Sequence, residues 1–409
     1  MRWLPFAIAL AAAQQPATRV LQLAPGVVEV HSETLIAPGT EVRGAATGTV
    51  IRFAADFKGR AAFVVAGSGV LLHDFTIDGN RDALERRTGL PGSNVPFAEF
   101  TTDSGILAQG ATDLRIERIG FRNIAGFAVL VSKSRRVLID RVRVADSGSR
   151  NAAGRNNTTG GILLEEGTAE FQVTRCQLTR IRGNGIWTHS LFTSPRNSRG
   201  LVALNRFDAL ARDAIQAGHA TEFRIEDNFG VHIGYPAEEI DIESQATPVG
   251  IDTAGDVDRS SYARNSFRDV AGKCIDLDGF HDGDVTANRC TAIASIGILF
   301  NDSNPNTRSK NIRMTGNVLD GVGLTGIYTF GTGHIIANNR LLNVNYTHSE
   351  VEGLDAGIYL GKGFLWLEPA RGNLIRGNEI TGYKMNARCV VSAPGVDRNS
   401  NRISANDCR

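Results

Sequence analysis

CIDLDGFHDGDVTANRC, residues 274–290, contains both of the short patterns from which the fold of this chain can be inferred. In its first part, Ile275 and Leu277 alternate with Asp276 and Asp278. A period of two is typical of a β-strand, so we expect the aliphatic side chains inside and the carboxylates outside. The second part, DVTANRC, also alternates, and it follows two glycines. The stretch therefore predicts two short strands separated by a turn.

The first pattern recurs along the chain as a small residue, then an aliphatic residue, then alternation. Its copies are GILAQ at 105, AVLVS at 128, GILLE at 161, GIWTH at 185, AIQAG at 214, GIDTA at 250, CIDLD at 274, GILFN at 297, GIYTF at 326, GIYLG at 357 and CVVSA at 389. They begin 23 to 36 residues apart. Propeller blades are longer, about 40 to 50 residues, and a sandwich does not repeat one phrase. The spacing therefore predicts the stacked coils of a solenoid.

Two further stretches resemble the coils of a known superfamily. VLLHDFTIDGNRD (70–82) and the segment at 21–53 are similar to coils of the right-handed parallel β-helix, or pectin-lyase-like, superfamily. The resemblance covers nearly the whole chain after its N-terminus. It implies one all-β domain at 18–409, a right-handed parallel β-helix of about 11–13 coils with entry coils at 18–82. Because that superfamily includes lyases, hydrolases, epimerases and structural proteins, and no subfamily motif is present, the resemblance leaves the activity open.

The N-terminus and the charge suggest where the protein works. Residues 1–17, MRWLPFAIALAAAQQPA, have a basic residue, an apolar stretch and small residues, as a secretion signal does. This apolar stretch is too short to span a bilayer, and no other apolar run in the sequence approaches the required length. The formal net charge of +1 gives no reason to expect nucleic-acid binding. We therefore expect a secreted or periplasmic protein without a membrane span, and the oligomeric state is left open.

Asparagine or cysteine ends the second pattern in most coils, which predicts a ladder of side chains at one turn. The predicted ladder positions are Cys176, Asn205, Asn228, Asn265, Cys290, Asn317, Asn339, Asn378 and Cys408. Buried asparagines stacked in this way hydrogen-bond each other and the turn backbone. Cys274 with Cys290, and Cys389 with Cys408, occupy the same two positions of two coils. Since an exported protein can form disulfides, we predict these two pairs, with Cys176 free.

The third and fifth residues of the repeated pattern should line one outward face, with neighbouring coils about 4.8 Å apart. The third positions are Leu107, Leu130, Leu163, Trp187, Gln216, Asp252, Asp276, Leu299, Tyr328, Tyr359 and Val391. The fifth positions are Gln109, Ser132, Glu165, His189, Gly218, Ala254, Asp278, Asn301, Phe330, Gly361 and Ala393. Polar residues collect between Glu165 and Asn301, over on the order of 24 Å. We expect a carbohydrate-binding groove there, walled by insertions such as residues 83–103.

Asp252, Asp276 and Asp278 should lie close together on the central coils, where repulsion raises the pKa of at least one of them. A protonated and an ionised carboxyl form the pair that hydrolyses a glycosidic bond. We therefore predict an enzyme that acts on a polysaccharide or oligosaccharide, with a glycoside hydrolase as the leading activity. These aspartates would form the acid/base centre, and His189 would assist.

The other polar and aromatic residues of the patch are predicted to bind substrate. Trp187 offers an apolar ring face to a pyranose, and His281 lies in a turn that could fold back over the groove. The predicted substrate-binding residues are Glu165, Trp187, Gln216, His219, His281 and Asn301.

Two other functions remain open from the sequence. The aspartates could hold Ca²⁺ against a uronic acid in a lyase or epimerase, with Lys273, Arg212 or His189 as the base. Alternatively, the groove could bind carbohydrate without reacting, as in a surface protein. Calcium is the one possible cofactor, no protein metal site is predicted, and the cysteine spacing matches no zinc motif.

Overall fold

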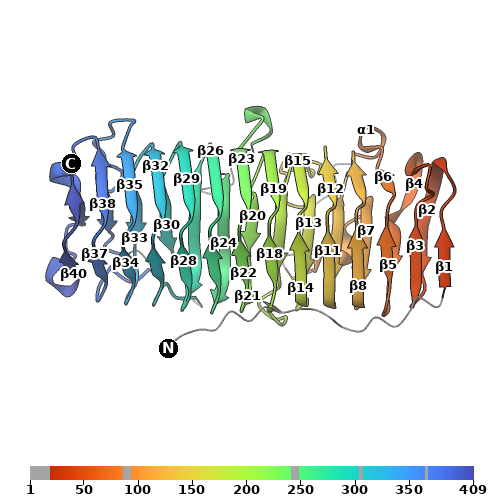
Figure 1. Cartoon of the computed structure of the whole chain (residues 1–409), viewed down its shortest axis with the longest axis horizontal. Coiled ribbons are helices and arrows are strands. Elements are labelled where there is room, and N and C mark those ends of the chain that lie inside the picture. Colours follow the sequence, from red (N-terminus) through yellow and green to blue (C-terminus); the bar gives the residue numbers. More distant parts are fainter. Residues whose placement is uncertain (1–18, 86–93, 241–247, 304–306, 364–366) are drawn as a thin grey trace.

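The computed structural model describes most of the chain as one continuous, all-parallel sheet wound along the long axis of the molecule (Figure 1). It describes residues 19–85, 94–240, 248–303, 307–363 and 367–409. The proposed secretion signal at 1–17 lies outside these residues. Every pairing between named strands is parallel and joins one coil to the next, which confirms the predicted all-β solenoid.

Three rows of strands run along the molecule. The front row carries the repeated pattern and consists of β2 (Gly26–Ile36), β4 (Thr49–Val65), β7 (Ser104–Gln109), β10 (Phe127–Ser132), β13 (Gly160–Glu165), β16 (Asn184–His189), β20 (Ile215–Ala217), β24 (Val249–Asp258), β27 (Lys273–His281), β30 (Ile298–Asn301), β33 (Ile327–Thr329), β36 (Ile358–Leu360) and β39 (Val390–Ser392). One strand per coil in this row agrees with the predicted 11–13 coils.

The second row follows the front row along each coil. It consists of β1 (Arg19–Gln22), β3 (Thr40–Arg43), β5 (Leu71–His73), β8 (Thr112–Glu117), β11 (Arg135–Asp140), β14 (Ala169–Thr174), β18 (Leu201–Ala203), β22 (Arg224–Glu226), β25 (Ser261–Ala263), β28 (Asp284–Thr286), β31 (Arg313–Thr315), β34 (Ile335–Ala337), β37 (Leu374–Arg376) and β40 (Arg402–Ser404). Two short strands, β17 (Asn197–Ser198) and β21 (Ala220–Thr221), lie between the front and second rows.

The third row closes each coil. It consists of β6 (Thr76–Asp78), β9 (Gly120–Arg122), β12 (Arg143–Ala145), β15 (Gln177–Ile181), β19 (Arg206–Leu210), β23 (Phe229–Ile233), β26 (Ser266–Val270), β29 (Arg289–Ile293), β32 (Val318–Val322), β35 (Arg340–Val344), β38 (Glu379–Gly382) and β41 (Asp407–Cys408). Because most pairings keep their register, equivalent residues of neighbouring coils line up along the axis, with register shifts between β2 and β4, β24 and β27, and β35 and β38.

The core lies inside the coil and is built from the aliphatic residue of each repeat. Ile186, Ile215, Ile251, Ile275 and Ile298 stack on one another and are at most 1% exposed. Burial of each such side chain contributes about 1.5–3 kcal/mol. Since strand side chains alternate, this row turns the residues between them toward the outer face of the front row.

The asparagine ladder exists but differs from the predicted one at two cysteines. Its members are Asn205, Asn228, Asn265, Asn288, Asn317, Asn339, Asn378 and Asn406, each accepting hydrogen bonds from the previous member. Cys176 is correctly placed at its end, since its backbone N–H donates to Asn205. The ladder predictions for Cys290 and Cys408 are wrong, because the turn comes two residues earlier and both cysteines already belong to the next strand.

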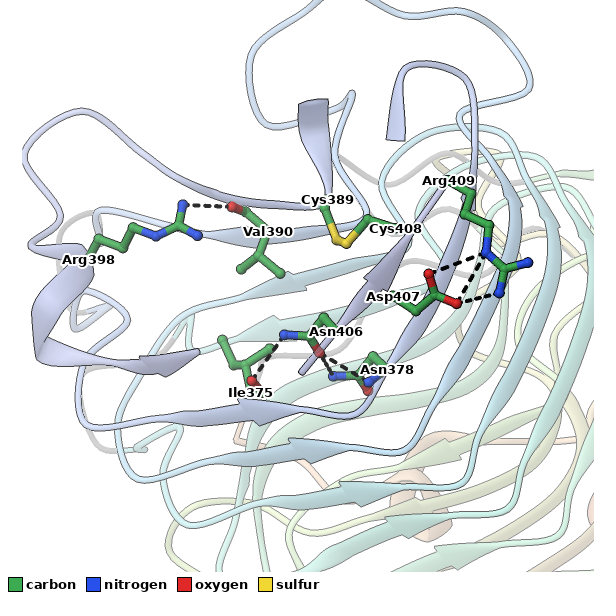
Figure 2. Close-up of a disulfide and its surroundings, with 9 residues drawn as sticks. All are labelled: Ile375, Asn378, Cys389, Val390, Arg398, Asn406, Asp407, Cys408 and Arg409. Carbon is green, nitrogen blue, oxygen red and sulfur yellow. Dashed lines mark hydrogen bonds and ion pairs between the residues drawn. A yellow bond between two sulfur atoms is a disulfide. The ribbon is translucent and has the colours of Figure 1, made fainter. Parts of the chain in front are cut away.

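Both predicted disulfides are confirmed. Cys274 is bonded to Cys290, Cys389 is bonded to Cys408, and Cys176 is a free, buried thiol. Figure 2 shows the second bond tying the start of the last front-row strand to the end of the chain, next to the last ladder pair. The disulfides therefore brace one central coil and the final coil.

Helices are few and short in the described residues. They are α1 (Arg81–Leu84), α2 (Phe97–Phe100), α3 (Met385–Arg388), η1 (Ala237–Glu239) and η2 (Arg398–Ser400). None of the helices in this part of the chain has the length and apolar character needed to cross a bilayer. α2 belongs to the insertion at 83–103, of which residues 86–93 are not described, and it packs on the front row.

Candidate functional site

The front row has the register that the repeated pattern predicts. Its third-position residues are direct neighbours from Leu107 in β7 to Val391 in β39. In the central coils, Gln216 of β20 pairs with Asp252 of β24, which pairs with Asp276 of β27. Neighbouring parallel strands are about 4.8 Å apart, so these polar side chains project side by side from the outer face.

Two further residues complete a cluster around this pair of aspartates. The Nζ atom of Lys273 donates to Oδ2 of Asp276 at 2.8 Å, and both side chains are nearly buried. Asp213, 3% exposed, accepts a hydrogen bond at 2.8 Å from the backbone N–H at the start of β24. Its charge interacts with those of Asp252 and Lys273. We call Asp213, Asp252, Asp276 and Lys273 the aspartate cluster.

A chain of side-chain amides orients Asp252. Nε2 of Gln216 donates to Oδ2 of Asp252 at 2.7 Å, and Oε1 of Gln216 accepts from Asn184 at 2.7 Å. Within the described part of the chain, Oδ1 of Asp276 is buried without a hydrogen-bond partner. Because an unsatisfied carboxylate oxygen is costly, this atom is suited to receive a hydrogen bond from a water or a ligand.

Burial and neighbouring charges shift the pKa values of the three aspartates in the cluster. Burial raises the pKa of Asp213 to about 6. Burial, and then the charges of Asp213 and Asp276, hold the pKa of Asp252 well above its ordinary value. Burial also raises the pKa of Asp276, but the Lys273 ammonium opposes this rise. The cluster therefore combines a carboxyl, Asp252, for which the proton is strongly favoured with one, Asp276, whose charge is stabilised by Lys273.

Asp278 lies on the same face as Asp276 but is held by a loop. It accepts hydrogen bonds from the backbone N–H of Ser303, at 2.7 Å, and from the Ser303 hydroxyl. Its neighbour on β30 is Asn301, whose side-chain oxygen accepts from the following backbone N–H. Asp278 thus adds negative charge beside Asp276, while its own oxygens are partly occupied.

The N-terminal half of the outer face is covered by α2 and its flanking residues. Glu165 is fully buried, and its carboxylate accepts hydrogen bonds at 2.8 Å from the backbone N–H groups of Phe97 and Ala98. Trp187 is 9% exposed, because Phe97 packs on it with ring centroids 4.9 Å apart. Neither side chain has a free surface for a sugar. We therefore leave Glu165 and Trp187 out of the proposed site, in contrast to the expectation from the sequence.

His189 and His219 form part of the same covered region. The ring of His189 lies 5.3 Å from those of Phe97 and Trp187, and it stacks on His219 at 6.5 Å. Burial lowers the pKa of His189 to about 4. Burial also lowers the pKa of His219, which lies against Phe192. Two neutral, largely aromatic-packed imidazoles border the cluster rather than join its hydrogen-bond network.

His281 is engaged at both ring nitrogens. Its Nε2 atom lies 3.0 Å from Asp256 and its Nδ1 atom 2.7 Å from Asp282. The hydrogen bond to Asp256 is the main cause that raises the pKa of His281. Arg196 also pairs with Asp256, at 2.7 Å. His281 therefore stabilises the turn after β27. Because both ring nitrogens are engaged, a ligand would contact His281 together with the ion pairs of Asp256 and Asp282.

From the sequence, Asp213 is not a candidate, and Lys273 is a candidate only as the base of the lyase or epimerase alternative. Both lie two residues before an inward isoleucine, where the chain enters the front strand, and only the residues after that isoleucine were counted as outward. The available signal was a polar residue at this same position in three central coils, namely Asn184, Asp213 and Lys273. Strict alternation does not hold where the chain enters a front-row strand, so these side chains also reach the outer face.

One group of side chains in the described residues has the composition of a metal site. Glu165, Glu166 and His189 offer ligand atoms within 4.8 Å of one another. However, both carboxylates already accept backbone N–H groups, from α2 and from the loop after β16. Since these bonds account for the arrangement, we assign no metal to it.

Comparisons with known proteins agree with this architecture. No family model and no curated protein sequence matches the chain. Among solved structures, it is similar to DFA-IIIase from Arthrobacter chlorophenolicus A6, at 15% identity over 94% of this chain and 87% of that one, with a TM-score of 0.57. The chain is a right-handed parallel β-helix with the pectin-lyase-like fold.

Two other β-helix structures illustrate how widely this fold is used. The periplasmic alginate epimerase AlgG is 13% identical over 94% of this chain and 79% of that one, with a TM-score of 0.58. PfbA, a surface adhesin of Streptococcus pneumoniae, is 13% identical over 83% of this chain and 84% of that one, with a TM-score of 0.50. At these identities the likeness establishes the β-helix fold, and the activity has to be argued from the site.

Proposed function

We propose that this β-helix is an exported carbohydrate-active enzyme, a glycoside hydrolase whose catalytic centre is the aspartate cluster. One observation carries the proposal: Asp252 and Asp276 project from adjacent strands in different electrostatic settings. The pKa of Asp252 is raised by burial and by its acidic neighbours, whereas Asp276 is paired with Lys273. Two carboxyls whose environments separate their protonation states are the requirement for acid/base cleavage of a glycosidic bond.

In this mechanism Asp252 is the general acid and Asp276 the general base. Asp252 gives its proton to the glycosidic oxygen while the bond from that oxygen to the anomeric carbon breaks. Asp276 takes a proton from the water whose oxygen bonds to the anomeric carbon. Gln216 orients the acid through its 2.7 Å hydrogen bond, and Lys273 keeps the base ionised.

The same residues weigh against the calcium-assisted lyase or epimerase. Lys273 already supplies a positive charge to the cluster, where a bound cation would otherwise be needed to relieve repulsion. Burial disfavours the Lys273 ammonium, but the charge and hydrogen bond of Asp276 outweigh burial and raise its pKa. A protonated lysine does not abstract a C5 proton. Because an epimerase and an adhesin are among the similar solved structures, the test also includes outcomes that would identify a lyase or a non-catalytic binding protein.

The test is product analysis against a panel of oligosaccharides and polysaccharides, with and without EDTA. New reducing ends that appear without the ultraviolet absorbance of an unsaturated uronate and do not depend on EDTA agree with the hydrolase. The ultraviolet absorbance of an unsaturated uronate that disappears with EDTA would instead identify a calcium-assisted lyase. Binding without any product would favour the non-catalytic protein.

A matched pair of variants connects turnover to the cluster. Asp276→Asn should reduce turnover by about 10²–10⁴-fold, the usual contribution of a general base, while saccharide binding remains measurable. Asp208→Asn, an exposed aspartate of β19 in the third row, is the control and should leave turnover unchanged. Equal activity of the two variants would remove the cluster from the mechanism.

A further inference from the structure

In the described part of the chain, the outer face of the front row is open over only a short length. On its N-terminal side, the third-position residues Leu130, Leu163 and Trp187 are 1%, 0% and 9% exposed. Together with Phe127 and Ala98 they form a buried apolar cluster, separate from the main core, against which Phe97 packs. α2 is therefore a wall that ends directly before Gln216, the first open position of the row.

A second insertion covers the row on its C-terminal side. Tyr359 is 4% exposed, and its hydroxyl donates to Glu352 at 3.1 Å. Gly353 is packed so tightly here that an added Cβ would lie 3.1 Å from the ring of Tyr328 and 3.2 Å from that of Tyr359. Residues 352–354 are therefore a second wall, which covers Tyr359 and contacts the edge of the partly exposed Tyr328.

Five third-position residues lie between the two walls: Gln216, Asp252, Asp276, Leu299 and Tyr328. All of them are partly exposed except Asp276, which is buried within the aspartate cluster. Four strand spacings of about 4.8 Å make this open length about 19 Å. Only two spacings, about 10 Å, separate the covered Trp187 from Asp252. A long polysaccharide that followed the row would therefore collide with α2 just beyond the reacting bond.

The C-terminal part of the open length has the surface that a sugar ring needs. Leu299 and Tyr328 are partly exposed and follow Asp276 directly in the row. Phe330, also partly exposed, lies with its ring centroid 5.0 Å from that of Tyr328. Aromatic and aliphatic side chains pack on the C–H faces of sugars, while Asn301 adds a polar side chain beside them.

We propose that the site accepts a short oligosaccharide, or the last units of a longer chain, lying between the α2 wall and residues 352–354 and packing on Tyr328. This inference rests on the proposed function and specifies its substrate class. Internal bonds of a long polysaccharide are then not cleaved, because the chain cannot extend past both walls. Products should be small from the first turnovers onward.

The experiment compares labelled oligosaccharides of increasing length with the parent polysaccharide. Rapid cleavage of short oligosaccharides, and release of small products from the polysaccharide without an early loss of viscosity, agree with the proposal. An early loss of viscosity with a broad range of product lengths would overturn it and leave the hydrolase intact. No turnover of any substrate would instead reject the proposed function on which it rests.

Variants of the two walls and of Tyr328, on which the sugar is proposed to pack, distinguish an effect on substrate binding from an effect on folding. Phe97→Ala should open the α2 wall and raise the ratio of rates on long and short substrates several-fold. Glu352→Ala, which removes the Tyr359 hydrogen bond at the other wall, is the second test if Phe97→Ala folds poorly. Tyr328→Ala should weaken binding several-fold, whereas Tyr346→Ala, 49% exposed in the loop after the third-row strand β35, is its control. Unchanged length preference and binding in all of them would contradict the proposal.

Discussion

At the scale of the residue, Lys273 places two adjacent aspartates in different electrostatic surroundings. It pairs with Asp276 at 2.8 Å, while Asp252 receives only the neutral amide of Gln216 at 2.7 Å. Asp213 then adds a negative charge that favours the proton on Asp252. Lys273 beside Asp276 and Arg212 near Asp213 therefore give the three buried carboxyls different tendencies to hold a proton.

This difference predicts the pH dependence of turnover. If Asp252 is the acid, activity falls on the alkaline side as Asp252 loses its proton. Asp213→Asn removes one of the negative charges that raise the pKa of Asp252, so this alkaline limb should move to lower pH. A profile of kcat/KM against pH, with Asp208→Asn as the control, measures the shift. An alkaline limb that stays in place would exclude Asp252 as the acid.

His189 predicts an acid-dependent loss of stability. Burial lowers its pKa to about 4 in the folded protein, compared with about 6.5 in the unfolded chain. Between these values the unfolded state binds the additional proton, so stability should fall as pH drops from about 6.5 to 4. His189→Gln should flatten this part of the profile of melting temperature against pH. An unchanged slope would mean that His189 is not the group responsible.

At the scale of the element, the asparagine ladder makes each turn depend on the next coil. The side chain of Asn265 accepts from the backbone and side chain of Asn228 at 3.1 and 2.9 Å. It also donates to Ile225 O and to Asn288, at 2.9 and 3.0 Å. Because these groups are buried, each lost hydrogen bond leaves a partner unsatisfied.

Asn265→Ala should therefore cost about 3–5 kcal/mol of unfolding free energy, at about 1 kcal/mol or somewhat more per hydrogen bond. Asn406, at the partly exposed end of the ladder, is the matched comparison (Figure 2). Asn406→Ala should cost less than half as much, because water can replace the lost contacts. Denaturant unfolding measures both values, and equal costs would show that burial does not decide the ladder's contribution.

At the scale of the whole molecule, stability is distributed coil by coil along the axis. Each strand of the three rows pairs only with the coils before and after it, as in other solenoids. The free energy of a local change is therefore felt mainly by neighbouring coils. The aspartate cluster lies in the middle of this stack, with several coils on either side (Figure 1).

Removing the terminal disulfide should therefore act locally. The bond between Cys389 and Cys408 closes a loop with a sequence separation of 19 residues, for which about 3 kcal/mol is typical. Cys389→Ala with Cys408→Ala should speed hydrogen exchange in β39 to β41 and leave β24 and β27 protected. Equal acceleration in the central strands would show a cooperative unit larger than neighbouring coils.

The sequence by itself determined the coil, its register and its disulfides. With a period of two and a repeat of about one coil, a shift of the register by one residue would expose the aliphatic second residue of the repeats, so burial of these residues fixes the register. That register also places Asp252 next to Asp276. Alternation along each front-row strand determines which side chains point outward. The outward third positions from Leu107 to Val391 can therefore be identified by counting residues from each inward aliphatic residue.

Only the tertiary structure decided which part of that outer face is available. α2 covers Glu165 and Trp187, and residues 352–354 cover Tyr359. Insertions do not follow the repeat, so their positions depend on side-chain packing between distant segments rather than on spacing. The same holds for Asp213 and Lys273, which reach the cluster from positions just before and at the start of front-row strands, where alternation does not hold. The repeat therefore determines which residues line the outer face of the front row. Contacts made by residues outside the repeat determine which part of that face can bind a ligand.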